Sequence, residues 1–298
     1  MKQFLLAVVP AAAMAVLLIF SDAAAEAARQ SLQLCAASVV PSLFPFLALS
    51  SLFLSCGGGD LLPYWLQHAA ARLLGCSNAG VSVFFLSLLG GYPTGARLIG
   101  QLYRTEQISR AEAEHLLLFC NNAGPAFILG FVGLGQWGSL RLGGYLYLIH
   151  AAAAALVAIL FRPQHPFPLP KYHAGPAVSF SSALVSAVTD AAETMVQICG
   201  FVTFFGTLLG LFAQLTGISH PLVLGFAELT AGISRLSHSQ WDFVSACFLL
   251  GWGGLSVHCQ TNAMFSGTGL SLAPHRKGKI LQGIFSAFLG FFAWFALK

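Results

Sequence analysis

The chain has 298 residues, of which 57% are hydrophobic and 8% charged, and its formal net charge is +4. Soluble domains carry about 25% charged residues, so this composition excludes an ordinary water-soluble domain. The mean hydropathy of +0.77 indicates that lipid is the solvent for much of the chain. A spanning helix needs roughly 20 apolar residues, so the length leaves room for about eight of them. The sequence contains no dense basic cluster, so we expect no nucleic-acid partner.

Residues that would support chemistry are not arranged in known patterns. The seven cysteines are scattered and form no C-x-x-C pair, so they predict small apolar core residues rather than disulfides or metal ligands. Neither a P-loop nor an H-E-x-x-H or G-x-S-x-G motif is present. We therefore expect an all-α, polytopic membrane protein that is not an enzyme and binds no cofactor or metal.

The N-terminal third opens with an apolar run over residues 2–20. Small residues follow this run, so a cleaved signal peptide is an alternative to a retained helix, but the rest of the chain is equally apolar and favours retention. A mixed helix over 22–33 then leads into a span at about 34–56. Pro41 and Pro45 remove backbone donors within this span, so we expect them to open the helix.

Polar or glycine-rich interruptions divide most of the later apolar segments. Residues 61–74 predict an interfacial helix, because they combine one apolar face with aromatic side chains. Beyond it, segment 81–101 is interrupted at Gly90-Gly91-Tyr92-Pro93-Thr94-Gly95, and segment 116–133 is interrupted at Asn121-Asn122-Ala123-Gly124-Pro125. A further span covers about 140–161.

A proline-rich linker at 163–178 separates a first membrane repeat, 1–162, from a second, 179–298. A long helix from about 179 is followed by two short interrupted segments and a last span, which is the order seen before the linker. Their interruptions are Glu228–Gly232 and Gly251–Gly254. Breaks at corresponding positions predict two inverted structural repeats with broken or re-entrant helices, which is a transporter architecture.

Basic residues gather in three loops, which the positive-inside rule would put together on the cytoplasmic side. If every interrupted segment crossed the membrane, the last basic loop would lie opposite the other two. We therefore expect at least one re-entrant hairpin per half. The loops carry Arg104 and Arg110, Arg162 and Lys171, and Arg276, Lys277 and Lys279.

The breaks hold the candidate substrate site. Broken helices present free N–H groups that suit an anion, and Arg97 adds a forked donor for a carboxylate, although it can equally reach the lipid headgroups. Two adjacent amides, Asn121 and Asn122, are costly in a membrane unless they bind a substrate, an ion or a neighbouring helix. Glu228 is suited to accept a coupling proton, bind a cation or form a structural salt bridge.

The complete set of candidates combines these residues with polar neighbours of the breaks. The predicted substrate-binding residues are Tyr92, Thr94, Arg97, Asn121, Asn122, Glu228, Ser256, His258 and Gln260. The predicted helix-break residues are Pro41, Pro45, Gly90, Gly91, Pro93, Gly95, Gly124, Pro125, Gly253 and Gly254.

These motifs, taken in order over about residues 30–297, resemble the YlbJ (SpoVV) family of sporulation integral membrane proteins. The resemblance implies membership of the nucleoside-recognition or Gate-domain group, which is related to concentrative nucleoside transporters. It further implies transport of dipicolinic acid across the outer forespore membrane during endospore formation.

Two other functions stay open at this point. One is a carrier of nucleosides or other small solutes on the same scaffold, and the other is a non-transporting membrane protein for spore cortex assembly. The expected partners are a small anionic substrate and the lipid bilayer. The coupling ion, H⁺ or Na⁺, and a homo-oligomeric state also stay open.

Overall fold

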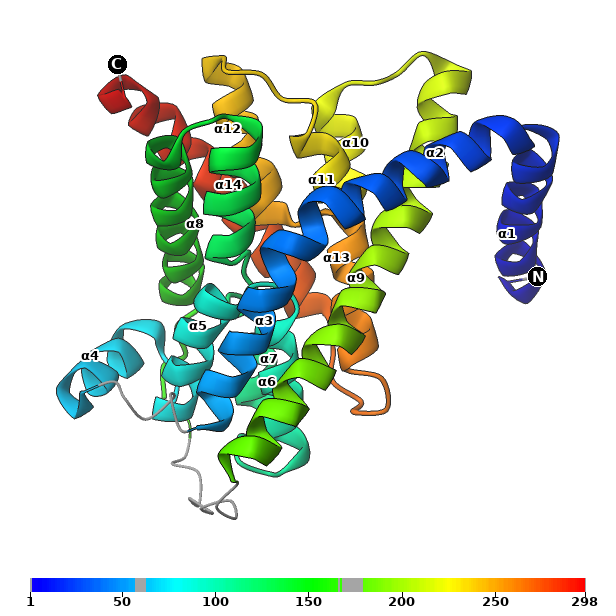
Figure 1. The fold of residues 1–298 in the computed structure, drawn as a ribbon. Coiled ribbons are helices and arrows are strands. Elements are labelled where there is room, and N and C mark those ends of the chain that lie inside the picture. Colours follow the sequence, from blue (N-terminus) through cyan, green and yellow to red (C-terminus); the bar gives the residue numbers. More distant parts are fainter. Residues whose placement is uncertain (1, 57–62, 166, 168–178, 298) are drawn as a thin grey trace.

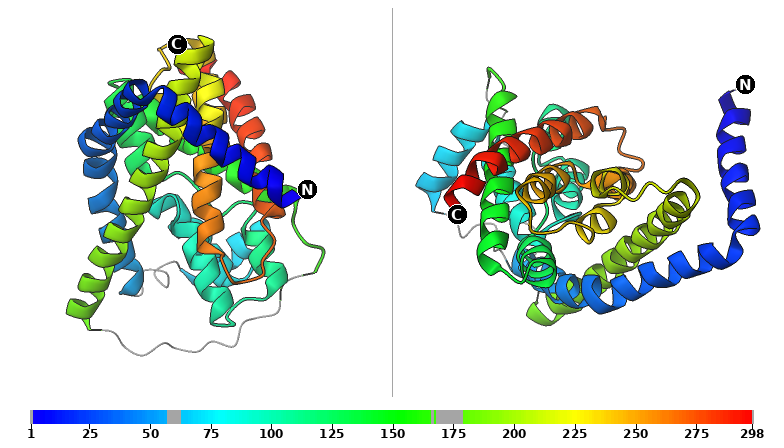
Figure 2. Two further views of the ribbon diagram at one scale, coloured as in Figure 1. Left: turned by 90° about the vertical axis from the view of Figure 1, so that its right-hand side faces the viewer. Right: turned by 90° about the horizontal axis from the view of Figure 1, so that it is seen from above.

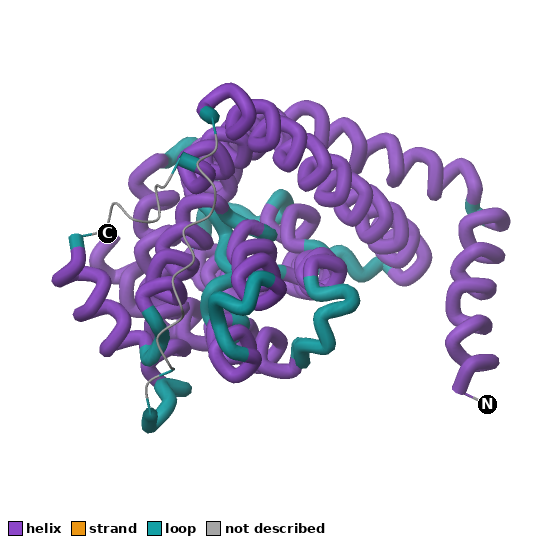
Figure 3. Tube along the Cα trace, turned by 90° about the horizontal axis from the view of Figure 1, so that it is seen from below, coloured by secondary structure: helices purple, strands orange, loops and turns teal. Residues whose placement is uncertain are grey.

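The computed structural model describes residues 2–56, 63–165, 167 and 179–297, and within these residues every regular element is a helix (Figures 1 and 3). This part of the chain contains 5 helices long and apolar enough to cross a membrane, or up to 6 if one bent pair counts as a span. The number is smaller than length alone allows, because the breaks divide several apolar segments into short helices. The all-α, polytopic fold class is confirmed.

The helices of the two halves follow the predicted segments closely. The first half contains α1 (Lys2–Ile19), α2 (Ser21–Leu34), the π-helical turn η1 (Cys35–Val39), α3 (Val40–Ser55), α4 (Tyr64–Leu74), α5 (Asn78–Gly90), α6 (Thr94–Arg104), α7 (Arg110–Leu116), the π-helix η3 (Ala126–Gln136) and α8 (Leu140–Leu160). The second half contains α9 (Phe180–Thr216), α10 (Pro221–Ala227), α11 (Leu229–Ile233), α12 (Gln240–Trp252), α13 (Gly254–Met264) and α14 (Ala273–Leu297). Most of the predicted linker lies outside the described residues, so the division into domains stays a prediction.

The expectation that Pro41 and Pro45 open their helix is wrong. Helices α2 and α3 form one continuous run through η1, in which the Val40 N–H bonds to the Cys35 carbonyl five residues earlier. This wider turn lies directly before Pro41, where the missing N–H would otherwise leave a carbonyl without its donor. A local change of hydrogen-bond register therefore replaces the predicted break.

Two long helical runs form one side of the molecule. The α2–α3 run and α9 lie side by side and run in opposite directions (Figure 1). Helix α1 stands apart from this bundle (Figure 2), and it exposes apolar side chains such as Val9 and Leu18. In a bilayer, lipid would be the natural solvent for such a helix.

Each half also contains a short helical hairpin and a broken helix. Helices α5 and α6 fold back on each other in the lower half of Figure 1, whereas α10 and α11 do so in the upper half. The interrupted segments α7–η3 and α12–α13 run beside these hairpins. The predicted breaks at Gly90–Gly95, Asn121–Pro125, Glu228 and Gly253 are therefore present, and each half has a short helical hairpin. The re-entrant course of these hairpins stays a prediction.

The described residues of the predicted basic loops lie at one end of the molecule, whereas Lys171 lies outside the described residues. Arg104 and Arg110 reach the segment between α13 and α14, where they donate to the carbonyls of Met264 at 3.4 Å and Gly269 at 3.0 Å. At the same end, the Lys277 ammonium lies 4.3 Å from the centre of the Phe161 ring. This common location agrees with the positive-inside argument, with one exception: Lys279 is not a loop residue but a fully buried residue of α14.

Candidate functional site

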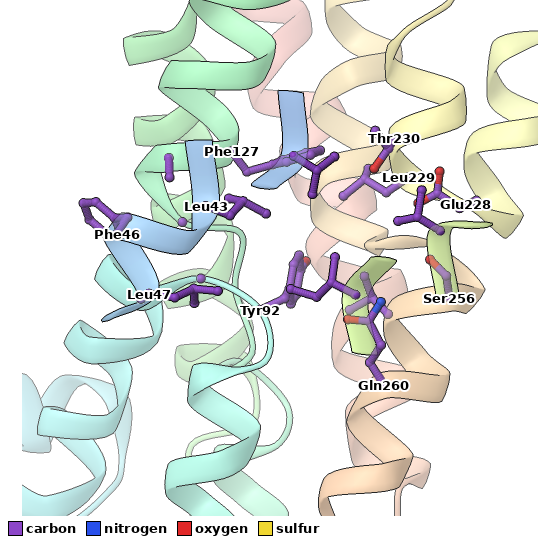
Figure 4. Close-up of a pocket in the computed structure, with 18 residues that line it drawn as sticks. Leu43, Phe46, Leu47, Tyr92, Phe127, Glu228, Leu229, Thr230, Ser256 and Gln260 are labelled. Atoms are coloured by element: carbon purple, nitrogen blue, oxygen red, sulfur yellow. The ribbon is translucent and has the colours of Figure 1, made fainter. Parts of the chain in front are cut away.

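The four breaks surround one central cavity (Figure 4). Helices α3 and α9 cover one side of it, and the two hairpin tips and the two broken helices supply the rest. About 610 Å³ of space lies between the lining side chains, open mouth included. Its lining residues are Val39, Leu43, Phe46, Leu47, Gly90, Gly91, Tyr92, Gly124, Ala126, Phe127, Ile198, Val202, Glu228, Leu229, Thr230, Ser256, Val257 and Gln260.

In the first half, the hairpin tip packs directly on the neighbouring break. Gly91 has a φ of +73°, which glycine adopts without strain, and it turns the chain between α5 and α6. A Cβ atom on Gly124 would lie 2.9 Å from the Gly91 Cα, so no side chain fits between the tip and the break. Tyr92 then reaches across to the second half, where its hydroxyl donates to the Leu250 carbonyl at 3.2 Å.

The second half repeats this contact with different residues. Glu228 ends α10 and caps α11, and its carboxylate accepts a hydrogen bond from the Ala231 N–H at 2.6 Å. A Cβ atom on Gly254 would lie 2.9 Å from the Leu229 nitrogen, so this tip also touches main chain at the break. The preceding Gly253 has a φ of +87°, at which α12 ends. The two halves therefore make the same kind of contact between hairpin tip and break.

The cavity combines apolar walls with a few polar groups on one side. Thr230 and Ser256 lie beside the Glu228 carboxylate, and the Gln260 side chain lies below them (Figure 4). The opposite wall is apolar and includes Phe46 and Phe127. Such a cavity suits a small molecule with one polar edge, because apolar walls supply contact area and a few polar groups set orientation.

Of the predicted substrate-binding residues, Tyr92, Glu228, Ser256 and Gln260 line the cavity. Thr230 also lines it, although it was not among them. Among the helix-break residues, Gly90, Gly91 and Gly124 contribute to the wall. The sequence signal for Thr230 was available, because it stands within the polar interruption that begins at Glu228.

Asn121 and Asn122 do not line the cavity but belong to a buried polar network. Asn121 donates to the Thr261 hydroxyl at 2.7 Å, and Asn122 donates to the Ser87 hydroxyl at 3.0 Å. The Asn122 carbonyl accepts from Gln282 at 2.9 Å. Both asparagines are fully buried, so the amides join helices rather than face the cavity, which is the second of the two roles predicted for them.

Most residues of this network were not among the predicted site residues. His150 on α8 accepts a hydrogen bond from the Ala123 N–H at 3.1 Å, and Gln282 on α14 accepts one from Lys279 at 2.7 Å. A signal for the α14 members was present in the helix periodicity. Polar residues recur at spacings of four, three and four along one face of this apolar helix, and all are buried: His275, Lys279, Gln282 and Ser286.

Arg97 lies in a second, smaller cavity next to the central one. Its guanidinium donates to the Asp190 carboxylate of α9 at 2.8 Å and to the Ser51 hydroxyl at 3.3 Å. Thr94 lines this second cavity as well, and Leu47 contributes to both cavities. A salt bridge of Glu228 with either Arg235 or Arg97 was one alternative for Glu228, and the structure instead pairs Arg97 with Asp190. Asp190 belongs to α9 and lies 93 positions after Arg97 in the sequence.

His258 also points away from the central cavity. Its ring lies 4.2 Å from that of Trp252 and 4.8 Å from that of His275, measured between ring centres. Although Ser256, His258 and Gln260 are each two residues apart, they stand on a helix, where residues two apart do not share a face. His258 is therefore not placed with the other two.

One curated relative matches the chain over almost its whole length. The sporulation integral membrane protein YlbJ of Bacillus subtilis is 27% identical over 318 residues, which cover 92% of this chain and 78% of that protein. This similarity supports the resemblance to the YlbJ family. The apolar helices of this chain describe a multi-pass integral membrane protein, in agreement with the name of this relative, a sporulation integral membrane protein. Family models give no match to the chain, and no solved structure matches it significantly.

Proposed function

We propose that the chain is a secondary transporter that carries a small organic anion through the central cavity. By the family resemblance, the substrate is dipicolinic acid and the membrane is the outer forespore membrane. The observation that carries this proposal is the meeting of four interrupted helices around one cavity. Non-helical backbone at membrane depth is tolerated where it lines a cavity, and transporters place their substrates at such breaks.

The arrangement of the halves supports transport rather than scaffolding. One hairpin lies towards each end of the molecule, and both tips meet the cavity at its centre (Figures 1 and 4). We take the two halves to be inverted repeats, which would let the cavity face either side of the membrane. A protein that only anchors an assembly would not require this symmetry or a polar cavity.

Arg97 supports an anionic substrate. Its ion pair with Asp190 is partly exposed, with side-chain exposures of 35% and 39%, and such pairs are worth about 0–1 kcal/mol. A carboxylate arriving in the second cavity could therefore replace Asp190 at little cost. Arg97 would bind the substrate carboxylate there before the aromatic ring of the substrate enters the apolar part of the central cavity.

Glu228 supports a proton as the coupling ion. Its side chain is buried, and no cation pairs with it among the described residues. The Cys35 thiol is the titratable group near it, and Thr230 and Ser256 supply its polar surroundings. A substrate carboxylate would be repelled by ionised Glu228, so binding of the anion and protonation of Glu228 would favour each other.

A neutral solute such as a nucleoside is the second candidate. It is favoured by one observation, which is that no arginine or lysine is among the described residues lining the central cavity. Gln260, Ser256 and Thr230 would bind a neutral polar edge without help from a cation.

Uptake of labelled dipicolinate into proteoliposomes tests the two candidates. We expect uptake above that of empty vesicles, loss of most uptake in Arg97→Ala, and near-normal uptake in Arg104→Ala, which removes an exposed arginine of the same helix. Absence of uptake by the wild-type protein would contradict the anion proposal. Uptake of labelled uridine that dipicolinate does not inhibit would favour the nucleoside.

A further inference from the structure

Lys279 is fully buried, and no acidic side chain among the described residues pairs with it. None of its ammonium contacts within the described residues is to a carboxylate. The ammonium donates to the main-chain carbonyl of Asn121 at 3.0 Å and to the side-chain carbonyl of Gln282 at 2.7 Å. It also lies 5.1 Å from the centre of the Tyr92 ring. Oxygen atoms and one aromatic face thus surround the positive charge.

The fold brings this ammonium to the first helix break. Gly278 presses the start of α14 against the Leu118 carbonyl so closely that a side chain there would clash with main chain. The next residue, Lys279, then meets Asn121, at the start of the interruption between α7 and η3. Burying an ion costs several kcal/mol unless its surroundings compensate, and here two carbonyl oxygens and the face of the Tyr92 ring supply the compensation.

The surroundings of the ammonium are those of an ion site in a broken helix. Unwound carbonyl groups at such breaks coordinate the coupling cation in many secondary transporters. Here the Asn121 carbonyl is such a group, and Gln282 adds a second oxygen. Tyr92 brings the tip of the first hairpin to the same place and also lines the substrate cavity.

We propose that the Lys279 ammonium occupies the position of a coupling cation at the first break, so that the protein binds and transports its substrate without Na⁺. This inference rests on the proposed transport function and decides between the two coupling ions that the sequence left open. A cation attached to the chain holds the hairpin tip and the break together permanently. The proton on Glu228 is then the only ion that binds and leaves.

Two measurements on the purified protein test this inference. The first is uptake of labelled dipicolinate into proteoliposomes in NaCl and in choline chloride, with the same pH gradient. We expect the wild-type protein to take up the same amount in both salts. The second is the melting temperature in detergent, which we expect to be the same in both salts for the wild-type protein and raised by NaCl for Lys279→Ala, because Na⁺ would bind the vacated oxygens.

Lys277→Ala is the matched control, since it removes an exposed lysine from the same helix. Its uptake and melting temperature should not depend on Na⁺. Wild-type uptake that requires Na⁺ would overturn the inference, as would a Lys279→Ala protein that melts at the same temperature in both salts. The wild-type measurement decides the question even if Lys279→Ala does not fold. Absence of uptake in every salt would instead defeat the proposed function, and the melting temperatures would still test the cation site.

Discussion

The broken helix of the first half, interrupted at Asn121–Pro125, differs from the breaks of the second half in how its polar groups are used. At this first break, Asn121 and Asn122 bond to side chains of three other helices, and Lys279 donates to the Asn121 carbonyl. In the second half, Glu228 and Ser256 face a cavity and make few bonds to other helices. A polar residue in a membrane break is therefore not in itself a substrate ligand. The polar groups of the first break hold neighbouring helices together, whereas those of the second half are free to bind a substrate.

The largest effect on stability should follow from a steric clash at the first break. In Gly95→Ala, the new methyl group would clash with the Cys120 carbonyl oxygen, and overpacking against main chain costs up to about 3 kcal/mol. We expect a large fall in the melting temperature and in the yield of folded protein. Gly130→Ala is the control, because a Cβ atom there meets nothing within 4 Å. Equal stability of the two variants would mean that the hairpin tip is not fixed to the break.

A smaller loss of stability is expected when the amide network is cut. Asn122→Ala leaves the Gln282 amide and the Ser87 hydroxyl without one of their partners, at a cost of about 2 kcal/mol. Melting in detergent measures the effect, with the exposed Asn262→Ala as control. If Asn122→Ala were as stable as the wild-type protein but failed to bind substrate, a structural role for this break in holding the helices together would be wrong.

The second break should respond in activity and not in stability. Glu228→Gln keeps the acceptor for the Ala231 N–H, so we expect a change in stability within about 1 kcal/mol. Wild-type uptake should rise as the pH falls, because a protonated Glu228 no longer repels the anion. The variant should lose this dependence, whereas Glu193→Gln, at an exposed position of α9, should keep it. A normal pH profile for Glu228→Gln would rule out the proton role.

Ser256→Ala should have the smallest effect of the four. Its hydroxyl lies in the cavity wall, so its loss removes one polar contact and should weaken substrate binding by about 1 kcal/mol, or roughly fivefold in apparent KM. The melting temperature should stay that of the wild-type protein. Ser266→Ala, which changes an exposed serine, is the control for KM. A fall in stability without a change in KM would assign Ser256 to the fold instead.

The sequence predicted the breaks well because their causes are local. Glycine, proline and paired amides interrupt an apolar run wherever the run folds, so the positions of Gly91, Asn121 and Gly253 could be found without any contact information. The Pro41 prediction was wrong because a change of register a few residues earlier accommodates the proline. That change is also local, but residue pattern does not reveal it.

Side-chain partners could not be predicted in the same way. Lys279 contacts Asn121 from 158 positions along the chain, and Arg97 contacts Asp190 from 93 positions. A basic residue near the start of a helix predicts a loop charge when only its neighbours are known. Its burial depends on how α14 packs against the first break, which is a property of the whole bundle.

The buried ammonium of Lys279 also has an electrical consequence. One elementary charge moved through the membrane field changes the energy by about 2.3 kcal/mol per 100 mV. A dissociable Na⁺ would cross only with the substrate and would add its charge to the net current. The charge of Lys279 stays on the protein, so any movement of α14 through the field is reversed when the empty carrier returns. Over a complete cycle it transfers no charge, and the membrane potential would act only on the substrate and its proton.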